Sequence, residues 1–150
     1  MSDSQYKKLP TPLEIEWILI FSCWLIAATG TLGSLFLSEV MGLTPCVLCW
    51  YQRIFMYPLV VVLLVGLFQV DRSVYRYALP LAIIGWCFAV YHYLVYSGYM
   101  PENLQPCSKE ASCAEINLEL LGFITIPMMS ILAYTAIIIL LFISRRRTPL

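Results

Sequence analysis

The chain has few charged residues and a single histidine. Of its 150 residues only 12% are Asp, Glu, Lys or Arg, against about 25% in a typical soluble domain, and 61% are hydrophobic. The 9 basic and 9 acidic residues leave no net charge, so the chain lacks the basic surface that nucleic-acid binding requires. The composition excludes an ordinary soluble domain and a nucleic-acid-binding protein, and it indicates a protein surrounded by membrane lipid.

Four long runs contain no Asp, Glu, Lys or Arg at all. A helix needs about 20 apolar residues to cross the hydrocarbon core of a bilayer. We therefore predict an all-α membrane protein, a four-transmembrane-helix bundle formed by a single domain, 1–150. The charge-free runs are Trp17–Ser38, Ile54–Val70, Tyr77–Met100 and Leu120–Ser144, and the expected helices cover 17–38, 51–70, 77–98 and 120–144. The first run is interpreted as a retained helix, because it is longer than the apolar core of a secretory signal and no small-residue cleavage site follows it.

The distribution of basic residues predicts the orientation of these helices. Four spans place both termini on one side of the membrane, and that side holds seven of the nine basic residues: Lys7, Lys8, Arg72, Arg76, Arg145, Arg146 and Arg147. Loops rich in Lys and Arg remain in the cytosol. We therefore expect cytosolic N and C termini and a multi-pass protein of the cell membrane, with two exterior loops that carry cysteines.

Four of the six cysteines lie in the two predicted exterior loops. Cys46 and Cys49 occupy the first loop, and Cys107 and Cys113 occupy the second. Disulfides form and persist on the exterior side of the membrane, because it is oxidising. The two pairs therefore indicate thiol–disulfide chemistry.

The residues inside the spans carry packing signals. Cys23 and Cys87 are expected to pack as small hydrophobic residues. Pro58 and Pro127 lie within the second and fourth runs, where a proline kinks a helix and can open a cavity. Small residues that allow close helix approach in a membrane occur at Gly30, Gly33, Gly66 and Gly85.

The segment Thr44-Pro45-Cys-Val-Leu-Cys-Trp-Tyr-Gln-Arg53 combines a dithiol with a cation. A hydroxyl residue followed by proline is typical of a helix start, so both thiols are expected in the first turn of the second helix. Arg53 lies one turn beyond Cys49 on the same face. The positive end of the helix dipole and the nearby cation both favour the thiolate, which is the reactive form of cysteine.

Other interpretations of these residues remain open. Four thiolates, from Cys46, Cys49, Cys107 and Cys113, could bind zinc, although a cation at Arg53 opposes a divalent metal. The pairs could be structural staples, although closing a loop between residues three apart stabilises a fold by only about 1.9 kcal/mol. Arg53 could be an interfacial anchor.

His92 is the only histidine, and it lies at about the expected depth of Arg53. An ionisable group inside a membrane is a functional candidate by default, and an imidazole can relay protons. A histidine that only hydrogen-bonds within the bundle is the alternative.

An electron path through dithiols needs an acceptor, and the sequence has no haem ligand pair, flavin fold or iron–sulfur spacing. A membrane bundle with proline kinks and aromatic residues beside the dithiol suits a lipid-soluble acceptor. A quinone is the expected cofactor.

The chain resembles the DsbB family of disulfide-bond formation proteins, in the BdbC-type branch of Gram-positive bacteria. The matching segments extend over nearly the whole chain: Pro45–Arg53, Tyr57-Pro58, Leu79–Trp86, Tyr91–Tyr93, Pro106-Cys107 with Cys113, and Gly122–Pro127. The resemblance implies a protein dithiol:quinone oxidoreductase that reoxidises a thioredoxin-like extracytoplasmic thiol oxidase, of the DsbA or BdbD kind. The acceptor would be menaquinone or ubiquinone, and no metal is expected.

The resemblance also implies roles for individual residues. The disulfides would be Cys46–Cys49 and Cys107–Cys113. Cys107 would form a mixed disulfide with the partner, and Cys113 would exchange with Cys46. Cys49 would contact the quinone, Arg53 would orient it, and His92 is a further candidate contact. The alternatives are a vitamin-K-epoxide-reductase-like quinone reductase, in which the loop cysteines precede the CxxC pair, and a zinc-binding membrane scaffold.

Overall fold

The computed structural model describes residues 11–42, 44–69, 73–99 and 125–147. Four long helices account for almost all of them, and no strand occurs in these ranges: α1 (Pro12–Leu35), continued by the π-helical segment η1 (Phe36–Val40), α2 (Val47–Gln69), α3 (Val74–Tyr96) and α4 (Ile126–Arg147). Each is apolar and long enough to cross a membrane, with a mean hydropathy between 1.7 and 2.5. The predicted all-α four-helix fold is confirmed, and it fits a multi-pass membrane protein.

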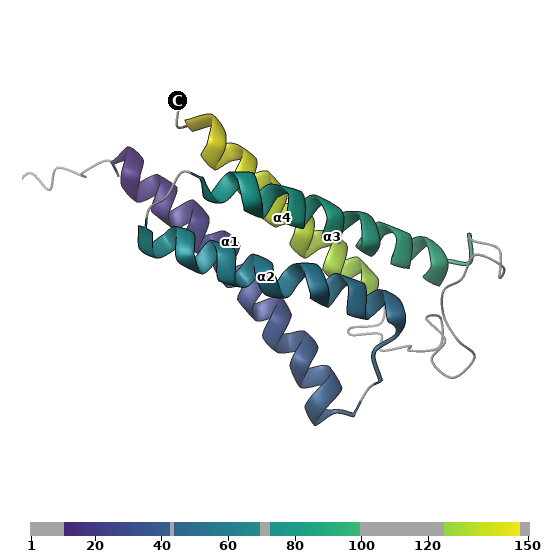
Figure 1. The fold of residues 1–150 in the computed structure, drawn as a ribbon. Helices are drawn as coiled ribbons and strands as arrows, with labels where there is room; N and C mark the ends of the chain where they lie inside the picture. The colour runs from purple at the N-terminus through teal and green to yellow at the C-terminus, as the bar shows by residue number, and fades with distance from the viewer. Residues whose placement is uncertain (1–10, 43, 70–72, 100–124, 148–150) are drawn as a thin grey trace, which may run out of the picture.

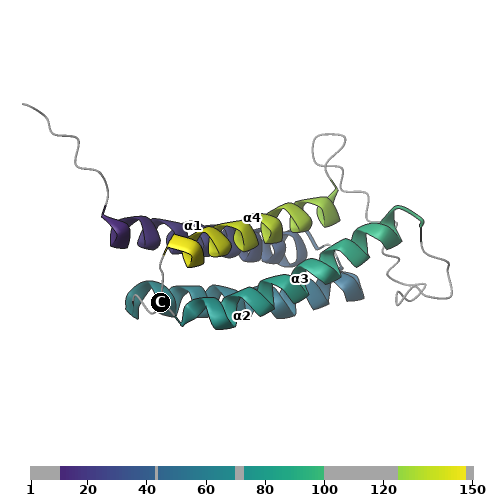
Figure 2. The same ribbon diagram turned by 90° about the horizontal axis from the view of Figure 1, so that it is seen from above.

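The helices form an elongated antiparallel bundle. Each packs against the helices before and after it in the chain, and α1 closes the ring against α4. Figure 2 shows α1 and α4 as one layer and α2 and α3 as the other. The start of α1 and the end of α4 lie at the same end of the bundle, and α2 begins at the opposite end (Figure 1).

Helix α1 begins earlier than the charge-free run suggests. The Glu14 amide donates a hydrogen bond to Thr11 Oγ1, and the Thr11 amide donates to Glu14 Oε2, so the two residues form a capping box. At the other end α1 widens into η1, where the Met41 amide donates to the Phe36 carbonyl. Gly42 follows with a φ of 67°, a left-handed conformation that glycine adopts without strain.

The prolines differ from the expected pattern at one position. Pro58 lies inside α2, as expected, and Pro80 lies inside α3. Pro127 is the second residue of α4, because this helix begins at Ile126 instead of the predicted position 120. The first turn of a helix has amides without intrahelical partners, so proline fits there and does not kink the helix. The prediction of a kink at Pro127 was wrong.

The bundle has an apolar core and an apolar exterior. Leu59, Leu63 and Ile137 are completely buried in the core. On the outside, large apolar side chains are exposed, and Phe68 is exposed at 82%. Such exposure along all four helices matches lipid contact, since lipid does not penalise exposed hydrocarbon. Cys23 is buried with its Sγ 3.8 Å from the Ile137 carbonyl oxygen, as the packing prediction requires. Cys87 is exposed, so the expectation that it packs inside the bundle was wrong.

Glycine permits close helix contact at two of the four expected positions. A Cβ at Gly85 on α3 would overlap the Tyr134 ring on α4, and one at Gly66 would overlap the Val74 side chain. A Cβ at Gly33 would meet no atom within 4 Å, and one at Gly30 would meet only the end of a flexible methionine. Gly85 therefore sets the separation of α3 and α4, and the close-packing expectation was wrong for Gly30 and Gly33.

Candidate redox site

Cys46 directly precedes α2 and caps its first turn. Its carbonyl accepts a hydrogen bond from the Trp50 amide at 3.1 Å, which is the first bond of the helix. Its Sγ accepts a hydrogen bond from the Cys49 amide at 3.4 Å. The thiol of Cys46 therefore occupies the capping position for which Thr44 was expected, at the positive end of the helix dipole.

The two thiols of the CxxC segment lie side by side. The Sγ atoms of Cys46 and Cys49 are 3.1 Å apart, and both residues are free cysteines in the structure. Cys46 is almost completely buried, at 1% exposure, whereas Cys49 is partly exposed. The two sulfur atoms therefore have different surroundings although they are one helical turn apart.

A second contact to Cys46 comes from α3. His92 is buried, and its Nε2 lies 3.7 Å from Cys46 Sγ. The other ring nitrogen, Nδ1, lies 3.0 Å from the side-chain amide nitrogen of Gln52, which is also buried. Cys46, His92 and Gln52 thus form a continuous hydrogen-bonded chain between α2 and α3.

These contacts alter the acidity of Cys46, which directly precedes the second apolar span. The pKa of Cys46 is lowered from 9.0 to about 4, chiefly by the side-chain hydrogen bond from Cys49. Burial opposes this effect, and the hydrogen bond from His92 adds to it. Cys46 is therefore a thiolate at neutral pH when the pair is reduced.

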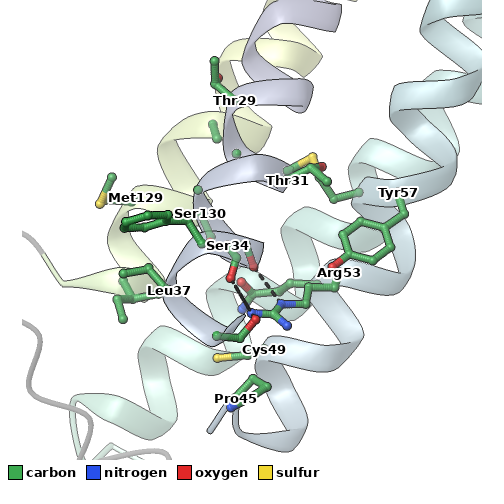
Figure 3. Close-up of a pocket in the computed structure, with 18 of the residues that line it drawn as sticks. Thr29, Thr31, Ser34, Leu37, Pro45, Cys49, Arg53, Tyr57, Met129 and Ser130 are labelled. Atoms are coloured by element: carbon green, nitrogen blue, oxygen red, sulfur yellow. Dashed lines mark hydrogen bonds between the residues drawn. The ribbon is translucent and has the colours of Figure 1, made fainter. Parts of the chain in front are cut away.

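A cavity of about 530 Å³ lies beside the dithiol, between α1, η1, α2 and the first turns of α4. Cys49, Gln52 and Arg53 line it, together with apolar residues and several hydroxyl groups. Figure 3 shows Cys49 and Arg53 on α2 beside Ser34 on α1, with dashed lines for the hydrogen bonds from Arg53 to Ser34. Neither Cys46 nor any described residue of α3 belongs to the wall, so within the CxxC segment only Cys49 has access to the cavity.

Arg53 is buried at the edge of the cavity and held in one orientation. Its Nε donates to Ser34 Oγ and its Nη2 donates to the Ser34 carbonyl, both at 2.7 Å. The guanidinium carbon also lies 5.5 Å from the centre of the Trp50 ring. A buried cation is costly unless it is hydrogen-bonded, so Ser34 makes the position of Arg53 possible.

Two further groups on the wall bear on what the cavity could bind. The hydroxyl oxygen of Thr31 is buried and has no hydrogen-bond partner among the residues that the structure describes. The Tyr134 hydroxyl donates to the Gln52 carbonyl at 2.8 Å and thereby ties α4 to the start of α2. The cavity thus combines a thiol, a fixed cation and an unsatisfied hydroxyl on largely apolar walls.

The structure brings together four of the six predicted site residues: Cys46, Cys49, Arg53 and His92. Cys107 and Cys113 lie outside the described residues. Sequence reasoning missed Ser34 and Gln52. Gln52 precedes Arg53 within the segment that carries the family resemblance, which is the only sequence signal for it, and Ser34 has none.

The same atoms bear on the zinc alternative. The Sγ atoms of Cys46 and Cys49 and a ring nitrogen of His92 lie within 4.8 Å of one another, a spacing that could hold a metal ion. A structural zinc ion usually takes four ligands, and the described residues offer three at this place. The Arg53 guanidinium also contributes a positive field at Cys49, which opposes a divalent cation.

A dithiol with one buried thiol and one thiol on a cavity, in a four-helix apolar bundle, is the arrangement of a membrane thiol oxidoreductase. A family model described as "Disulfide bond formation protein DsbB" matches residues 16–144. The chain is 45% identical over 140 residues to a "Probable disulfide formation protein" of Metapseudomonas resinovorans, covering 93% of this chain and 97% of the relative. It is 41% identical over 122 residues to "Disulfide bond formation protein C" of Bacillus subtilis, covering 81% and 88%. No solved structure matches the chain.

The chain belongs to the DsbB family of disulfide bond formation proteins. It is a membrane oxidoreductase that forms disulfides, and the resemblance inferred from the sequence is confirmed. The relatives include BdbC-type proteins of Bacillus, and they are not restricted to that genus. The family assignment replaces the vitamin-K-epoxide-reductase-like alternative.

Proposed function

We propose that the protein reoxidises a thioredoxin-like extracytoplasmic thiol oxidase and passes the electrons to a quinone. Electrons would move from the partner to Cys107 and Cys113, then to Cys46 and Cys49, and from Cys49 to the acceptor. The observation that carries the proposal is the joint position of Cys49 and Arg53 on one cavity in an apolar bundle.

The residues on the cavity wall fit a quinone ring. A pocket that is largely apolar with a few placed polar groups is the usual form of a small-molecule site. Arg53 and the Thr31 hydroxyl are hydrogen-bond donors suited to the two carbonyl oxygens of such a ring. The Thr31 hydroxyl in particular lacks a partner among the described residues, which supports a ligand at this place.

Each residue of the site then has a chemical task. A bound quinone would supply the acceptor for the two electrons that the dithiol releases when its disulfide forms. Arg53 holds a positive charge beside Cys49, and Ser34 fixes the direction of that charge. The largely apolar walls keep water from the sulfur atoms, so the charge acts in a medium of low dielectric constant.

We also propose that the start of α2 faces the exterior of the cell membrane. The described basic residues at the opposite end include Arg76, Arg145 and Arg146, in agreement with cytosolic termini. On this orientation the dithiol meets the exterior segment that carries Cys107 and Cys113. A labelling reagent that does not cross membranes should then modify a cysteine introduced at Gly98, and no labelling from outside the cell would refute the orientation.

The variant Arg53→Ala tests the proposed acceptor site. Removing the guanidinium should slow quinone reduction about 100-fold or more, because buried electrostatic groups at reacting centres contribute about 2.7–4 kcal/mol. Thiol exchange between the two cysteine pairs should remain close to normal, since Arg53 is held by Ser34 and Trp50 and lines the cavity, which Cys46 does not.

The matched control is Arg76→Ala, which removes an exposed cation on α3 far from the cavity. Quinone reduction by purified protein in detergent, and exchange followed by trapping of thiols, provide the two readouts. Equal losses of both activities in Arg53→Ala would refute the proposed role.

A zinc-binding scaffold is the second candidate, and the spacing of Cys46, Cys49 and His92 is the observation in its favour. The two functions differ in thiol and metal content after purification. The redox function predicts disulfides that a reductant opens and metal well below one ion per chain. Four reduced thiols with one bound zinc ion would establish the scaffold instead.

A further inference from the structure

His92 lies apart from the cavity although it is buried beside the dithiol. The wall includes residues of α1, η1, α2 and α4, and none of the described α3 residues. Both ring nitrogens of His92 already have partners within the protein, Cys46 on one side and Gln52 on the other. Its contacts therefore point to the chemistry of Cys46 and away from the cavity.

The contact with Gln52 determines which ring nitrogen carries the proton. The nitrogen of the Gln52 side chain faces His92 Nδ1 at 3.0 Å, and an amide nitrogen can only donate. Nδ1 must accept this bond, so the proton of the neutral ring is on Nε2. That N–H points to Cys46 Sγ at 3.7 Å.

The surroundings of Cys46 suit a thiolate and not a thiol. Its Sγ receives the Cys49 amide and faces His92 Nε2–H, and the residue is only 1% exposed. A buried charge without donors would be strongly unfavourable. Two fixed N–H groups provide the hydrogen bonds that water supplies to an exposed thiolate.

We propose that His92 is a catalytic hydrogen-bond donor that stabilises Cys46 as the leaving thiolate in disulfide exchange with the exterior pair, and that Gln52 is its positioning residue. The inference deepens the proposed function and rests on its order of electron transfer. It assigns the two cysteines different tasks, with Cys46 as the leaving group of exchange and Cys49 as the residue on the cavity.

The exchange step balances without an additional reactant. It begins from a mixed disulfide between Cys113 and Cys46. The Cys107 thiolate attacks Cys113 Sγ, the Cys107–Cys113 bond forms, and the Cys113–Cys46 bond breaks. Cys46 leaves with the electron pair, so one thiolate is consumed and one is released. The His92 hydrogen bond strengthens as the charge develops on Cys46 Sγ, and no proton is transferred.

The reduction equilibrium of the Cys46–Cys49 pair tests this role without a quinone. The measurement uses the full chain with Cys107 and Cys113 both replaced by Ser, equilibrated with glutathione in detergent. His92→Phe keeps a ring of similar size and removes the donor. It should lower the equilibrium constant for reduction about tenfold, which is about 30 mV for a two-electron couple. His92→Gln retains an N–H donor and should restore most of the loss.

The control is Tyr93→Phe, an exposed neighbour on α3 that should leave the equilibrium unchanged. If His92→Phe fails to fold, Gln52→Glu carries the test, because a carboxylate that accepts from Nδ1 favours a ring with a proton on both nitrogens. This variant should make the pair easier to reduce, whereas a purely structural role predicts no gain.

An unchanged equilibrium in His92→Phe would overturn the proposal, and so would an equal loss in His92→Gln. If only Gln52→Glu can be measured, an unchanged or lower equilibrium constant would overturn it. Because glutathione replaces both the partner and the acceptor, these outcomes are independent of the Arg53 experiment. Failure of the quinone hypothesis would appear in the Arg53→Ala assay and not in the glutathione equilibrium.

Discussion

Replacement of Ser34 by Ala is the most selective perturbation of the proposed acceptor site. It removes the hydroxyl that accepts from Arg53 Nε, while the Ser34 carbonyl still accepts from Nη2. A hydrogen bond to a charged group contributes about 1.5–3 kcal/mol. Because the bond from Nη2 to the Ser34 carbonyl remains, the expected loss is at the low end of this range, about 1.5 kcal/mol. Since about 1.36 kcal/mol is tenfold in rate, kcat/KM for quinone reduction should fall about tenfold.

Thr29→Ala is the matched control for this variant. Thr29 lines the same cavity from the same helix, but its hydroxyl donates to the carbonyls of Leu25 and Ile26 within α1. The assay is steady-state quinone reduction by purified protein, with Ser34→Thr as the variant that restores the hydroxyl. If Ser34→Ala retains normal kcat/KM, or if Thr29→Ala loses as much, orientation of Arg53 by Ser34 is not required for activity.

Further predictions concern the bundle and the dithiol. Gly85→Ala should lower thermal stability, because the added methyl overlaps the Tyr134 ring, whereas Gly33→Ala should not; equal melting temperatures would contradict the packing. Tyr75→Phe removes the hydroxyl that donates to the buried Glu16 carboxylate at 2.9 Å, so the free energy of unfolding in denaturant should fall by about 1–3 kcal/mol. An unchanged free energy of unfolding would contradict this prediction. In the reduced protein, thiolate absorbance should persist at neutral pH and decline as pH falls through about 4, because the pKa of Cys46 is lowered to about 4. The stabilisation that this lowered pKa gives the folded protein is complete above pH 9.0 and is lost progressively as the pH falls from 9.0 to about 4. Thiolate absorbance that is already lost as the pH falls through 9.0 would refute the lowered pKa.

The fold could be predicted because its determining signal is local. A run of about 20 apolar residues without charge has few alternatives to a membrane helix, and all four runs became helices. The boundaries were less accurate, because a helix can continue past charged residues. Helix α1 includes Glu14 and Glu16, and the latter is buried against the Tyr75 hydroxyl on α3. The π-helical turn at the end of α1 has no sequence signal of its own.

The candidate site was only partly predictable, because the spacing within α2 is local and the contacts between helices are not. The CxxC segment and the following Arg53 could be read directly from positions three and four residues apart. The partners of Arg53 and Cys46 come from α1 and α3, at separations of 19 and 46 residues. Which face of each helix meets its neighbour depends on packing throughout the bundle, so Ser34 and the His92–Gln52 contact required the structure.

The central claim, that the dithiol passes electrons to a quinone beside Cys49, is tested most directly by stoichiometry. Fully reduced protein with Cys107 and Cys113 replaced by Ser is mixed with excess quinone in the absence of oxygen, and both thiols and quinol are counted. The account predicts one quinol formed for each dithiol lost, and no quinol from the Cys49→Ser variant. Thiols that stay reduced in the presence of quinone, or quinol formation that persists in Cys49→Ser, would contradict it.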